Sequence, residues 1–346
     1  MKAAKLRPGD LVEVRTKAEI LATLDEQGRL DGLPFMPEMF AFCGKRFQVF
    51  KRAHKTCDTV FPVRGRRMKD AVHLETRCDG AAHGGCQAGC LLFWKTAWLR
   101  KVDAHSAAKP STGAPTLARC TEQDVQKHTR THSAHLEERP TYVCQATQLP
   151  YFTSDLHWWD LRQYVEDYLS GNVGLREIVR GGIYATYYGI SEAGIGAGPF
   201  MRWLYDRLHL LWRGPMFPRK VGTIPVGAPT PSCRLDLKEG DLIRVKSHAE
   251  ILETLNTESK NRGMLFEAEL VPYCGSERRV LKLVRNIIDE KSGKMLTFNT
   301  PAIILEDVYC RSRYSYNRMF CPRAIYSYWH DVWLEKPADK TAELPR

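Results

Sequence analysis

Leu6-Arg-Pro-Gly-Asp-Leu-Val-Glu-Val-Arg15 recurs in the same chain as Leu237-Lys-Glu-Gly-Asp-Leu-Ile-Arg-Val-Lys246. The offset of 231 residues between these stretches also aligns several later positions. They include Ala18-Glu-Ile-Leu with Ala249-Glu-Ile-Leu, Phe35 with Phe266, Glu38 with Glu269 and Cys43-Gly with Cys274-Gly. After four extra residues in the second copy, Cys86 and Trp98 align with Cys321 and Trp333. A repeat of about 100 residues that occurs only twice is too long for a solenoid unit, so the sequence predicts a duplicated domain.

Each copy reads as a short helix between strands. In the first copy Leu11-Val-Glu-Val alternates apolar and polar residues after a Gly-Asp turn, which is typical of a strand. Apolar residues at helical spacing then predict a helix over 18–24, with Thr16 as its cap. Further strands are expected at 47–51 and 72–75, and equivalent segments occur in the second copy. These elements suit a small barrel, so the sequence predicts an α+β fold.

The opening Pro8-Gly-Asp-Leu-Val-Glu-Val resembles that of SH3-like barrels in translation and transcription factors. As a whole pattern, the chain resembles uncharacterised bacterial proteins with two SH3-like barrel repeats and a Cys-rich motif. The resemblance implies two duplicated small SH3-like β-barrel domains that flank a helical middle segment. It implies no activity.

The repeat and the composition of the chain between its copies predict the domain boundaries. Residues 104–117, rich in Ala, Ser, Pro, Thr and Gly, read as a linker, and three helices are expected after it. The expected helices lie at 159–169, 173–188 and 199–212. The predicted parts are a first barrel repeat at 1–102, a linker with a helical middle domain at 103–235, a second barrel repeat at 236–337 and a tail at 338–346.

Composition and charge bound the class of protein. Of the 346 residues, 43% are hydrophobic and 26% charged, which is typical of folded soluble chains. The net charge of +11 favours association with polyanions such as nucleic acid, but it indicates no chemistry. The most apolar stretch, 181–191, is far shorter than the ~20 residues of a membrane span, and the N-terminus reads as a turn and strand rather than a secretory signal. We therefore expect a cytoplasmic protein with no membrane partner.

Eleven cysteines in a reducing compartment are more often ligands, catalytic groups or buried apolar residues than disulfides. A cluster in the first repeat consists of Cys57, Cys78, Cys86 and Cys90. The last three belong to the glycine-rich loop Cys78-Asp-Gly-Ala-Ala-His-Gly-Gly-Cys-Gln-Ala-Gly-Cys90, whose small residues allow backbone N–H groups to point at thiolate sulfurs. In the second copy Ile288 and Ile325 replace two of the four, so single positions tolerate apolar residues. The complete quartet predicts a metal or cofactor site.

The spacing of the loop cysteines favours an iron–sulfur cluster of the 4Fe-4S type. Zinc sites usually present Cys-x₂-Cys pairs, and this chain has none, so Zn²⁺ is the alternative cofactor. Phe93, Trp94 and Trp98 follow the loop and are expected to shield a bound cluster from water.

Other residues could also serve as ligands. Three histidines could each replace a thiolate, namely His83, His73 and His54, although a lone His among loop glycines is more often exposed. A second candidate metal site combines Cys144, Cys274, Cys310 and Cys321. The alternative for Cys310 and Cys321 is that they are buried apolar residues, and Cys274 shares its position with Cys43 in the other copy, which favours one structural role in both.

Two functions are compatible with these residues. The first is a Cys-ligated metalloprotein, with an iron–sulfur cluster, that acts in a redox or sulfur-handling step on a small molecule or partner protein. The second is a nucleic-acid- or ribosome-associated binding protein with structural zinc and tandem SH3-like barrels. Basic residues interleave with aromatic ones at 311–318 and 323–329, a pattern that can grip phosphates and stack bases but that also suits a barrel core. Catalytic residues, and whether the protein is an enzyme, stay open.

Overall fold

The computed structural model describes residues 5–60, 63–102, 119–131, 140–194, 196–208, 211 and 215–337. The predicted linker at 104–117 and the predicted tail at 338–346 lie outside these residues. The chain divides into two compact units. Unit 1 comprises Met1–Arg180, Asn286–Thr297 and Tyr316–Ile325. Unit 2 comprises Gly181–Arg285, Phe298–Ser315 and Tyr326–Arg346.

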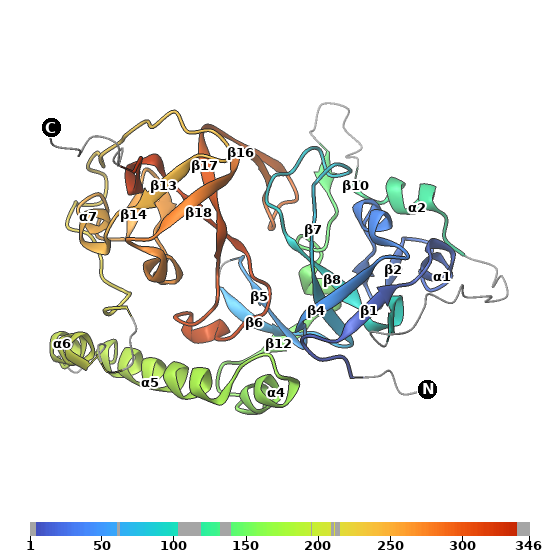
Figure 1. Ribbon diagram of the computed structural model, residues 1–346, viewed down its shortest axis with the longest axis horizontal. Helices are drawn as coiled ribbons and strands as arrows, with labels where there is room; N and C mark the ends of the chain where they lie inside the picture. The colour runs from blue at the N-terminus through green and yellow to red at the C-terminus, as the bar shows by residue number, and fades with distance from the viewer. Residues whose placement is uncertain are drawn as a thin grey trace, which may run out of the picture. The chain divides into compact units, whose positions relative to one another are not determined.

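Unit 1 contains a five-stranded antiparallel sheet with the strand order β8-β7-β4-β1-β9 (Figure 1). Its strands are β1 (Leu11–Val14), β4 (Arg46–Arg52), β7 (Ala71–Arg77), β8 (Leu91–Lys95) and β9 (Leu99–Lys101). After β1, the helix α1 (Lys17–Leu21) begins with a capping box in which Thr16 and Glu19 satisfy each other's backbone N–H groups. The Thr16 cap is therefore confirmed, and the helix is shorter than predicted.

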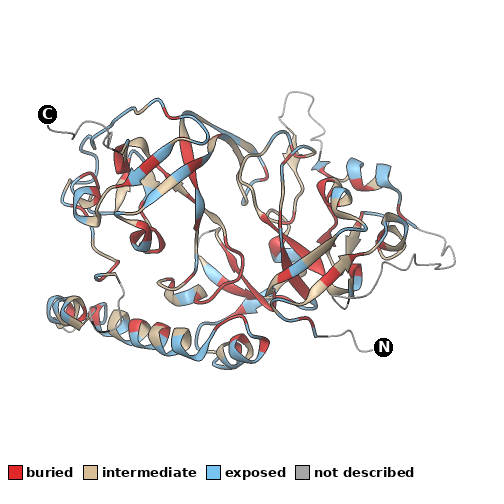
Figure 2. Ribbon diagram, in the orientation of Figure 1, coloured by how far each residue is buried: buried red, intermediate tan, exposed pale blue. Residues whose placement is uncertain are grey.

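Strands β7 and β8 are almost entirely buried and belong to the core of unit 1 (Figure 2). Trp94 and Trp98 are fully buried, and the ring of Phe35 meets that of Trp98 edge-on at 5.1 Å between centroids. Trp98 Nε1 donates a hydrogen bond to Thr23 Oγ1 at 3.0 Å. Burial of these large rings dominates the packing of the unit, because each removes a large apolar area from water.

Smaller elements of unit 1 pack around the sheet. They are β2 (Arg29–Leu30), β3 (Leu33–Pro34), the 3₁₀ helices η1 (Pro37–Phe42), η2 (Thr96–Trp98) and η5 (Tyr316–Arg318), β5 (Lys55–Asp58), β6 (Arg64–Arg67), α2 (Glu122–Lys127), β10 (Arg130–Thr131), β11 (Thr141–Tyr142), α3 (Leu149–Phe152), β12 (Ser154–Leu156) and α4 (Arg162–Ser170). The strands β12, β6 and β5 form a three-stranded antiparallel sheet. Residues after the first predicted boundary at 102 therefore belong to the same compact unit as the first repeat.

Unit 2 contains a second five-stranded sheet, in the order β18-β17-β16-β13-β19 (Figure 1). Its strands are β13 (Leu242–Val245), β16 (Glu277–Ile288), β17 (Met295–Tyr309), β18 (Tyr326–Trp329) and β19 (Leu334–Glu335), of which β16 and β17 extend into unit 1 at one end. Its smaller elements are α6 (Gly198–Leu208), α7 (His248–Leu252), β14 (Lys260–Asn261), β15 (Met264–Leu265), η4 (Ala268–Tyr273) and η6 (Asp331–Trp333).

The two five-stranded sheets agree in detail. Leu11 pairs with Gln48 in unit 1, and Leu242 pairs with Arg279 in unit 2, which is the same register at the offset of 231. The helix α7 has the same capping box as α1, built from Ser247 and Glu250. Trp333 Nε1 donates to Thr254 Oγ1 at 3.1 Å, which repeats the contact between Trp98 and Thr23. The sequence match between the copies thus corresponds to matched local structure.

The compact units differ from the predicted division of the chain. Helices occur in the predicted middle segment, as α4, α5 (Leu175–Ser191) and α6, but α4 lies in unit 1 and α6 in unit 2. They do not form a third compact unit within the part of the chain that the structure describes. The protein mixes helices with several small antiparallel sheets. Among the described residues no helix combines the length and the apolarity that a membrane crossing requires.

Candidate metal centre

The cysteine-rich loop of residues 78–90 connects β7 to β8 in unit 1. At its base the Cys78 N–H donates to the Cys90 carbonyl at 2.9 Å, so the two ends of the loop are joined directly. Inside the loop the His83 and Gly85 N–H groups both donate to the Gly80 carbonyl at 3.0 Å. These bonds fold 13 residues into a compact turn and bring its first and last cysteines together.

Gly80 makes this turn possible. Its φ is +74°, and a Cβ built at this position would lie 2.0 Å from the Cys86 carbonyl oxygen. No side chain fits there, because the neighbour is backbone and the conformation is left-handed. Glycine at this position is therefore what allows the chain carrying Cys86 to cross close to the chain that follows Cys78.

A buried ion pair holds the loop to the core of unit 1. His83 Nδ1 lies 2.6 Å from Glu38 Oε1, and the same oxygen accepts the Ala82 N–H at 3.1 Å. Burial would raise the pKa of Glu38, but the hydrogen bond and the charge of His83 outweigh it and lower that pKa below its ordinary value. His83 Nε2 lies 3.1 Å from the Val143 carbonyl. Both ring nitrogens thus face oxygen acceptors, which is the pattern of a doubly protonated imidazole.

The Cys144 segment is fixed against the same loop. Gln145 is buried, its Nε2 donates to the Phe93 carbonyl at 3.0 Å, and its Oε1 accepts the Phe93 N–H at 2.8 Å. The side chain thereby pairs with β8 as a short strand would. The Tyr142 N–H donates to the Gly293 carbonyl at 2.8 Å. Cys144, between these two anchors, lies beside the loop although 54 residues separate it from Cys90.

Four thiols line one pocket in unit 1. They are Cys78, Cys86, Cys90 and Cys144. Other lining residues are Met36, His83, Phe93, Gln145, Ile288 and Arg323. The cavity that these residues line measures about 30 Å³.

Burial favours the protonated form of three of these thiols, Cys78, Cys90 and Cys144. It raises the pKa of Cys90 to about 12 and the pKa values of Cys78 and Cys144 above their ordinary value. The guanidinium of Arg323 opposes this at Cys90, because its positive charge favours the thiolate. A metal must displace the protons, and binding is then stronger at higher pH.

Arg323 brings a buried positive charge to the pocket wall. Its side chain is 3% exposed, and its Nη2 donates to Glu290 Oε1 at 2.7 Å. The Ile288 N–H also donates to Cys86 Sγ at 3.4 Å. A guanidinium and a backbone N–H directed at sulfur both favour negative charge on the thiols.

Cys57 is not among the residues that line this pocket. It lies in β5, where its thiol hydrogen-bonds with the thiol of Cys321. That bond is the main reason that the pKa of Cys57 falls to about 6; burial opposes the shift, and Arg323 assists it. The structure therefore brings together three of the four predicted cluster cysteines and adds Cys144, which the sequence assigned to a second site.

The second predicted set is divided between the units. Cys144 and Cys321 belong to unit 1, and Cys274 and Cys310 belong to unit 2. Cys274 ends η4 as Cys43 ends η1, and each donates its N–H to the residue three positions earlier. This repeated geometry is a structural role of the kind that the sequence indicated.

Two of the three predicted histidines lie outside the pocket wall. His73 Nδ1 lies 2.9 Å from the Leu92 carbonyl, and burial lowers the pKa of His73 to about 3. His54 Nε2 lies 3.0 Å from Asp167 Oδ1. Only His83 reaches the pocket.

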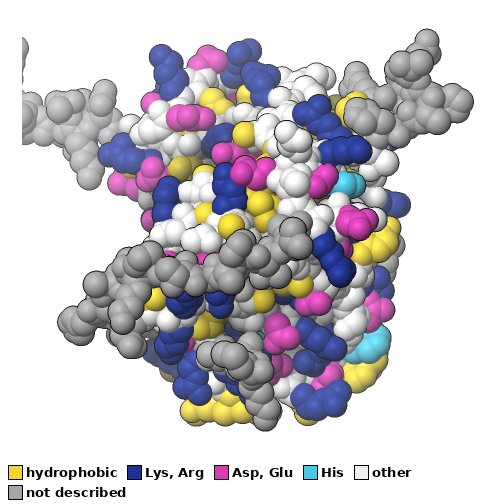
Figure 3. Space-filling model, turned by 90° about the vertical axis from the view of Figure 1, so that its right-hand side faces the viewer, with side chains coloured by type: hydrophobic (Ala, Val, Ile, Leu, Met, Phe, Trp, Pro, Cys, Tyr) yellow, Lys and Arg dark blue, Asp and Glu magenta, His cyan; other side chains and the backbone are white. Residues whose placement is uncertain are grey.

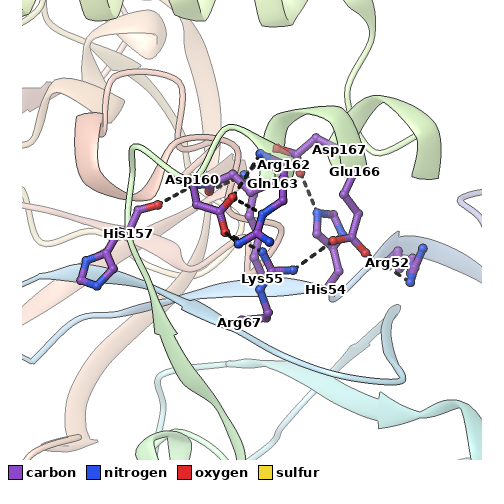
Figure 4. Close-up of polar contacts among 10 residues, drawn as sticks. All are labelled: Arg52, His54, Lys55, Arg67, His157, Asp160, Arg162, Gln163, Glu166 and Asp167. Carbon is purple, nitrogen blue, oxygen red and sulfur yellow. Dashed lines mark hydrogen bonds and ion pairs between the residues drawn. The ribbon is translucent and has the colours of Figure 1, made fainter.

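The polar cluster around Asp167 joins α4 to β5 through buried hydrogen bonds and ion pairs (Figure 4). Lys55 Nζ donates to Asp167 Oδ2 at 2.5 Å, to Gln163 Oε1 at 3.3 Å and to the Met319 carbonyl at 2.8 Å. Burial lowers the pKa of Lys55, and Asp167 opposes that shift. These three acceptors occupy all three N–H groups of the ammonium, so Lys55 joins α4 and the segment around Met319 to β5 and has no donor left for a substrate.

Within the described residues, one group of three metal-ligating side chains has all its ligand atoms within 4.8 Å: Glu38, Cys78 and His83. No three of the pocket thiols meet that limit. Four sulfurs at ~2.3 Å from one tetrahedral zinc lie about 3.8 Å apart. The thiols of a four-iron cluster each bind a different iron and are spaced more widely.

The distribution of surface charge does not indicate a particular class of ligand on the face shown in Figure 3. On the face shown in Figure 3, Lys and Arg side chains are interspersed with Asp and Glu side chains. Comparisons with protein-family models, with curated proteins and with solved structures found no match. The pocket is therefore the feature of the described chain that points to a function.

Proposed function

We propose that unit 1 binds an iron–sulfur cluster of the 4Fe-4S type through Cys78, Cys86, Cys90 and Cys144. The observation that carries the proposal is that four thiols from two separate stretches of chain, the loop 78–90 and the segment at Cys144, line one pocket. Cys57, which the sequence placed in the quartet, is not part of this set.

The residues around the thiols support this cofactor. A four-iron cluster with four thiolates carries net negative charge, and Arg323 places a buried positive charge at the pocket wall. Phe93 is buried in the wall and excludes water, and the Ile288 N–H is directed at Cys86 Sγ. Hydrogen bonds to the sulfurs and exclusion of solvent are the protein's means of setting a cluster's reduction potential.

When bound, such a cluster supplies reversible one-electron transfer. The function we propose is a redox or sulfur-handling step on a small molecule or partner protein. In this step the chain's own residues hold the cluster, exclude water and balance its charge.

We also propose that the two five-stranded sheets are duplicated SH3-like barrels. The equal strand order, the equal register of Leu11 and Leu242, and the repeated contact between a Trp and a Thr support a common ancestor fold for the two copies.

The alternative function is a nucleic-acid- or ribosome-associated binder with structural zinc. One observation favours a single ion: Glu38 Oε2 is buried, has no hydrogen-bond partner among the described residues, and belongs to the group with Cys78 and His83. Against it, both nitrogens of His83 already face acceptors, so an ion would have to displace that pair.

Metal analysis of anaerobically purified protein separates the two. The proposal predicts a brown protein with iron and acid-labile sulfide in equal amounts, about four of each per chain. A colourless protein that retains one zinc per chain, and loses it on Glu38→Gln substitution, would overturn the proposal in favour of the alternative.

A further inference from the structure

A second pair of thiols meets in unit 1, away from the residues that line the metal pocket. Cys57 in β5 and Cys321 in the segment Tyr316–Ile325 share a thiol–thiol hydrogen bond. Their exposed fractions are 1% and 4%. Thiols in hydrogen-bond contact need only a small approach to form a disulfide.

The segment that carries Cys321 is held in place on both sides of it. Before Cys321, Asn317 Nδ2 donates to the Val63 carbonyl and the Met319 carbonyl accepts from Lys55. After it, Arg323 Nη1 donates to the carbonyl of Cys57 itself at 3.0 Å. These contacts position Cys321 on β5.

The backbone around Cys321 is strained. Phe320 has φ +61° and Ala324 has φ +45°, both in the left-handed region that non-glycine residues rarely adopt. Such residues are stable only where the surroundings fix them, and they concentrate at functional sites.

Cations flank the pair on both sides. Lys55 interacts electrostatically with Cys321, whereas Arg323 and Arg318 lower the pKa of Cys57 and the carboxylate of Glu290 opposes them. Positive charge beside a thiol favours the thiolate, which is the nucleophilic form. The pKa of Cys57 falls to about 6, which favours its thiolate form.

We propose that Cys57 and Cys321 are a redox-active thiol pair that closes to an intramolecular disulfide on reaction with hydrogen peroxide. This proposal is independent of the cluster. The Cys57 thiolate attacks one peroxide oxygen and becomes a sulfenic acid, and the departing hydroxide takes a proton to form water. The Cys321 thiol then attacks the Cys57 sulfur, and the hydroxyl leaves as a second water. Two thiols lose two electrons and two protons, and one peroxide becomes two waters.

The duplication provides an internal comparison. Cys57 corresponds to Ile288 and Cys321 to Cys86, and the corresponding residues also meet, because the Ile288 N–H donates to Cys86 Sγ at 3.4 Å. The pair of Cys57 and Cys321 has two thiols, whereas the pair of Ile288 and Cys86 has one. Only the pair of Cys57 and Cys321 has the second sulfur that a disulfide requires.

The test is peptide mapping of the full-length protein, purified anaerobically, treated with hydrogen peroxide and alkylated without reduction. Trypsin places each relevant cysteine in its own peptide: 56–64 for Cys57, 319–323 for Cys321 and 221–234 for the exposed Cys233. We expect peptides 56–64 and 319–323 to be recovered joined, two hydrogens lighter than their sum, before Cys233 is oxidised.

Variants and pH sharpen the result. Cys321→Ser should leave Cys57 as a sulfenic acid that dimedone traps. In the wild-type protein the rate of disulfide formation should reach half its maximum near pH 6 and level off above it.

Recovery of both peptides as free thiols while Cys233 is oxidised would overturn the proposal. So would loss of iron from the Cys57→Ser and Cys321→Ser double variant, because these thiols would then be ligands. The iron content of the untreated protein tests the cluster separately.

Discussion

Corresponding strands are followed by loops that a buried glutamate holds in place with different contacts. These loops are 78–90 after β7 and 310–325 after β17. Each is tied down by a buried glutamate at the same repeat position, Glu38 or Glu269. Glu269 uses both carboxylate oxygens, which accept the Arg313 and Tyr314 N–H groups and the Ser315 hydroxyl. Glu38 binds an amide and an imidazole through Oε1 alone, and its Oε2 has no partner in the described chain.

In the second copy both carboxylate oxygens of Glu269 accept hydrogen bonds, whereas in the first copy Glu38 Oε2 has no partner among the described residues. In the first loop the Glu38 carboxylate pairs with the imidazole of His83 as well as with an amide, and thiols line the pocket beside this pair. The same scaffold thus provides a hydrogen-bonded turn at residues 313–315 in unit 2 and a candidate site in unit 1.

Removing the carboxylate charge should have the largest effect on stability. Glu38→Gln leaves the buried imidazole of His83 without its counter-charge, and we expect a loss of about 3–5 kcal/mol in the free energy of unfolding. The matched Glu269→Gln variant retains one acceptor oxygen for neutral donors and should lose about 1–2 kcal/mol. Urea unfolding measures both, and equal losses would contradict the distinction between the loops.

The Glu38 effect should also depend on pH. Because the folded state lowers the pKa of Glu38 from its ordinary value of 4.5, its contribution is fully present above that value and is lost as the pH falls through the folded pKa. The difference in unfolding free energy between wild type and Glu38→Gln should therefore shrink in acid. A difference that stays constant from pH 7 to pH 3 would show that the carboxylate charge is not the stabilising feature.

A smaller effect is expected from the loop glycines. Gly80→Ala places a methyl group against the Cys86 carbonyl, whereas Gly85 has a similar φ of +74° and open space around its Cβ position. We expect Gly85→Ala to cost about 1 kcal/mol from backbone strain and Gly80→Ala about 2 kcal/mol more. Thermal unfolding and metal content of both variants measure this; similar values for the two would mean that the close crossing at Cys86 is unimportant.

The smallest effect on stability is expected from the hydrogen bond between a Trp and a Thr that both copies contain. Thr23→Val and Thr254→Val each remove the acceptor of a buried Trp N–H and the donor to a helix carbonyl. Each should cost about 1–2 kcal/mol, and the two values should agree within about 0.5 kcal/mol. Hydrogen exchange of the indole N–H groups reports each unit separately, and a large inequality would argue against equivalent scaffolds.

The sequence predicted the shared scaffold well because register depends on local alternation. Leu11 and Leu242 open identical patterns, and the structure pairs them identically with Gln48 and Arg279. Helices occur at the predicted places, but α4 buries Gln163 and Asp167 and exposes Val165 and Leu169. Periodicity identifies a helix without showing which face is buried, because the buried partner Lys55 is distant in sequence.

The candidate site was predictable only in part. Spacing indicated Cys78, Cys86 and Cys90, since one loop carries all three. It could not distinguish Cys57 from Cys144, because both are remote from the loop along the chain and only tertiary packing selects one. The signal for Cys144 is its neighbour Gln145, whose buried amide pairs with β8 at Phe93. Glu38 carried a signal too, as an acidic residue kept at the same position in both copies, and the sequence reading did not use it.

The most direct test of the four-thiol site is the iron content of two single variants purified anaerobically, Cys144→Ala and Cys57→Ala. Both replace a buried or partly buried cysteine of unit 1, but only Cys144 lines the pocket. We expect Cys144→Ala to lose most of its iron and sulfide and Cys57→Ala to retain the wild-type amount. Full iron in Cys144→Ala, or its loss from Cys57→Ala, would contradict the assignment.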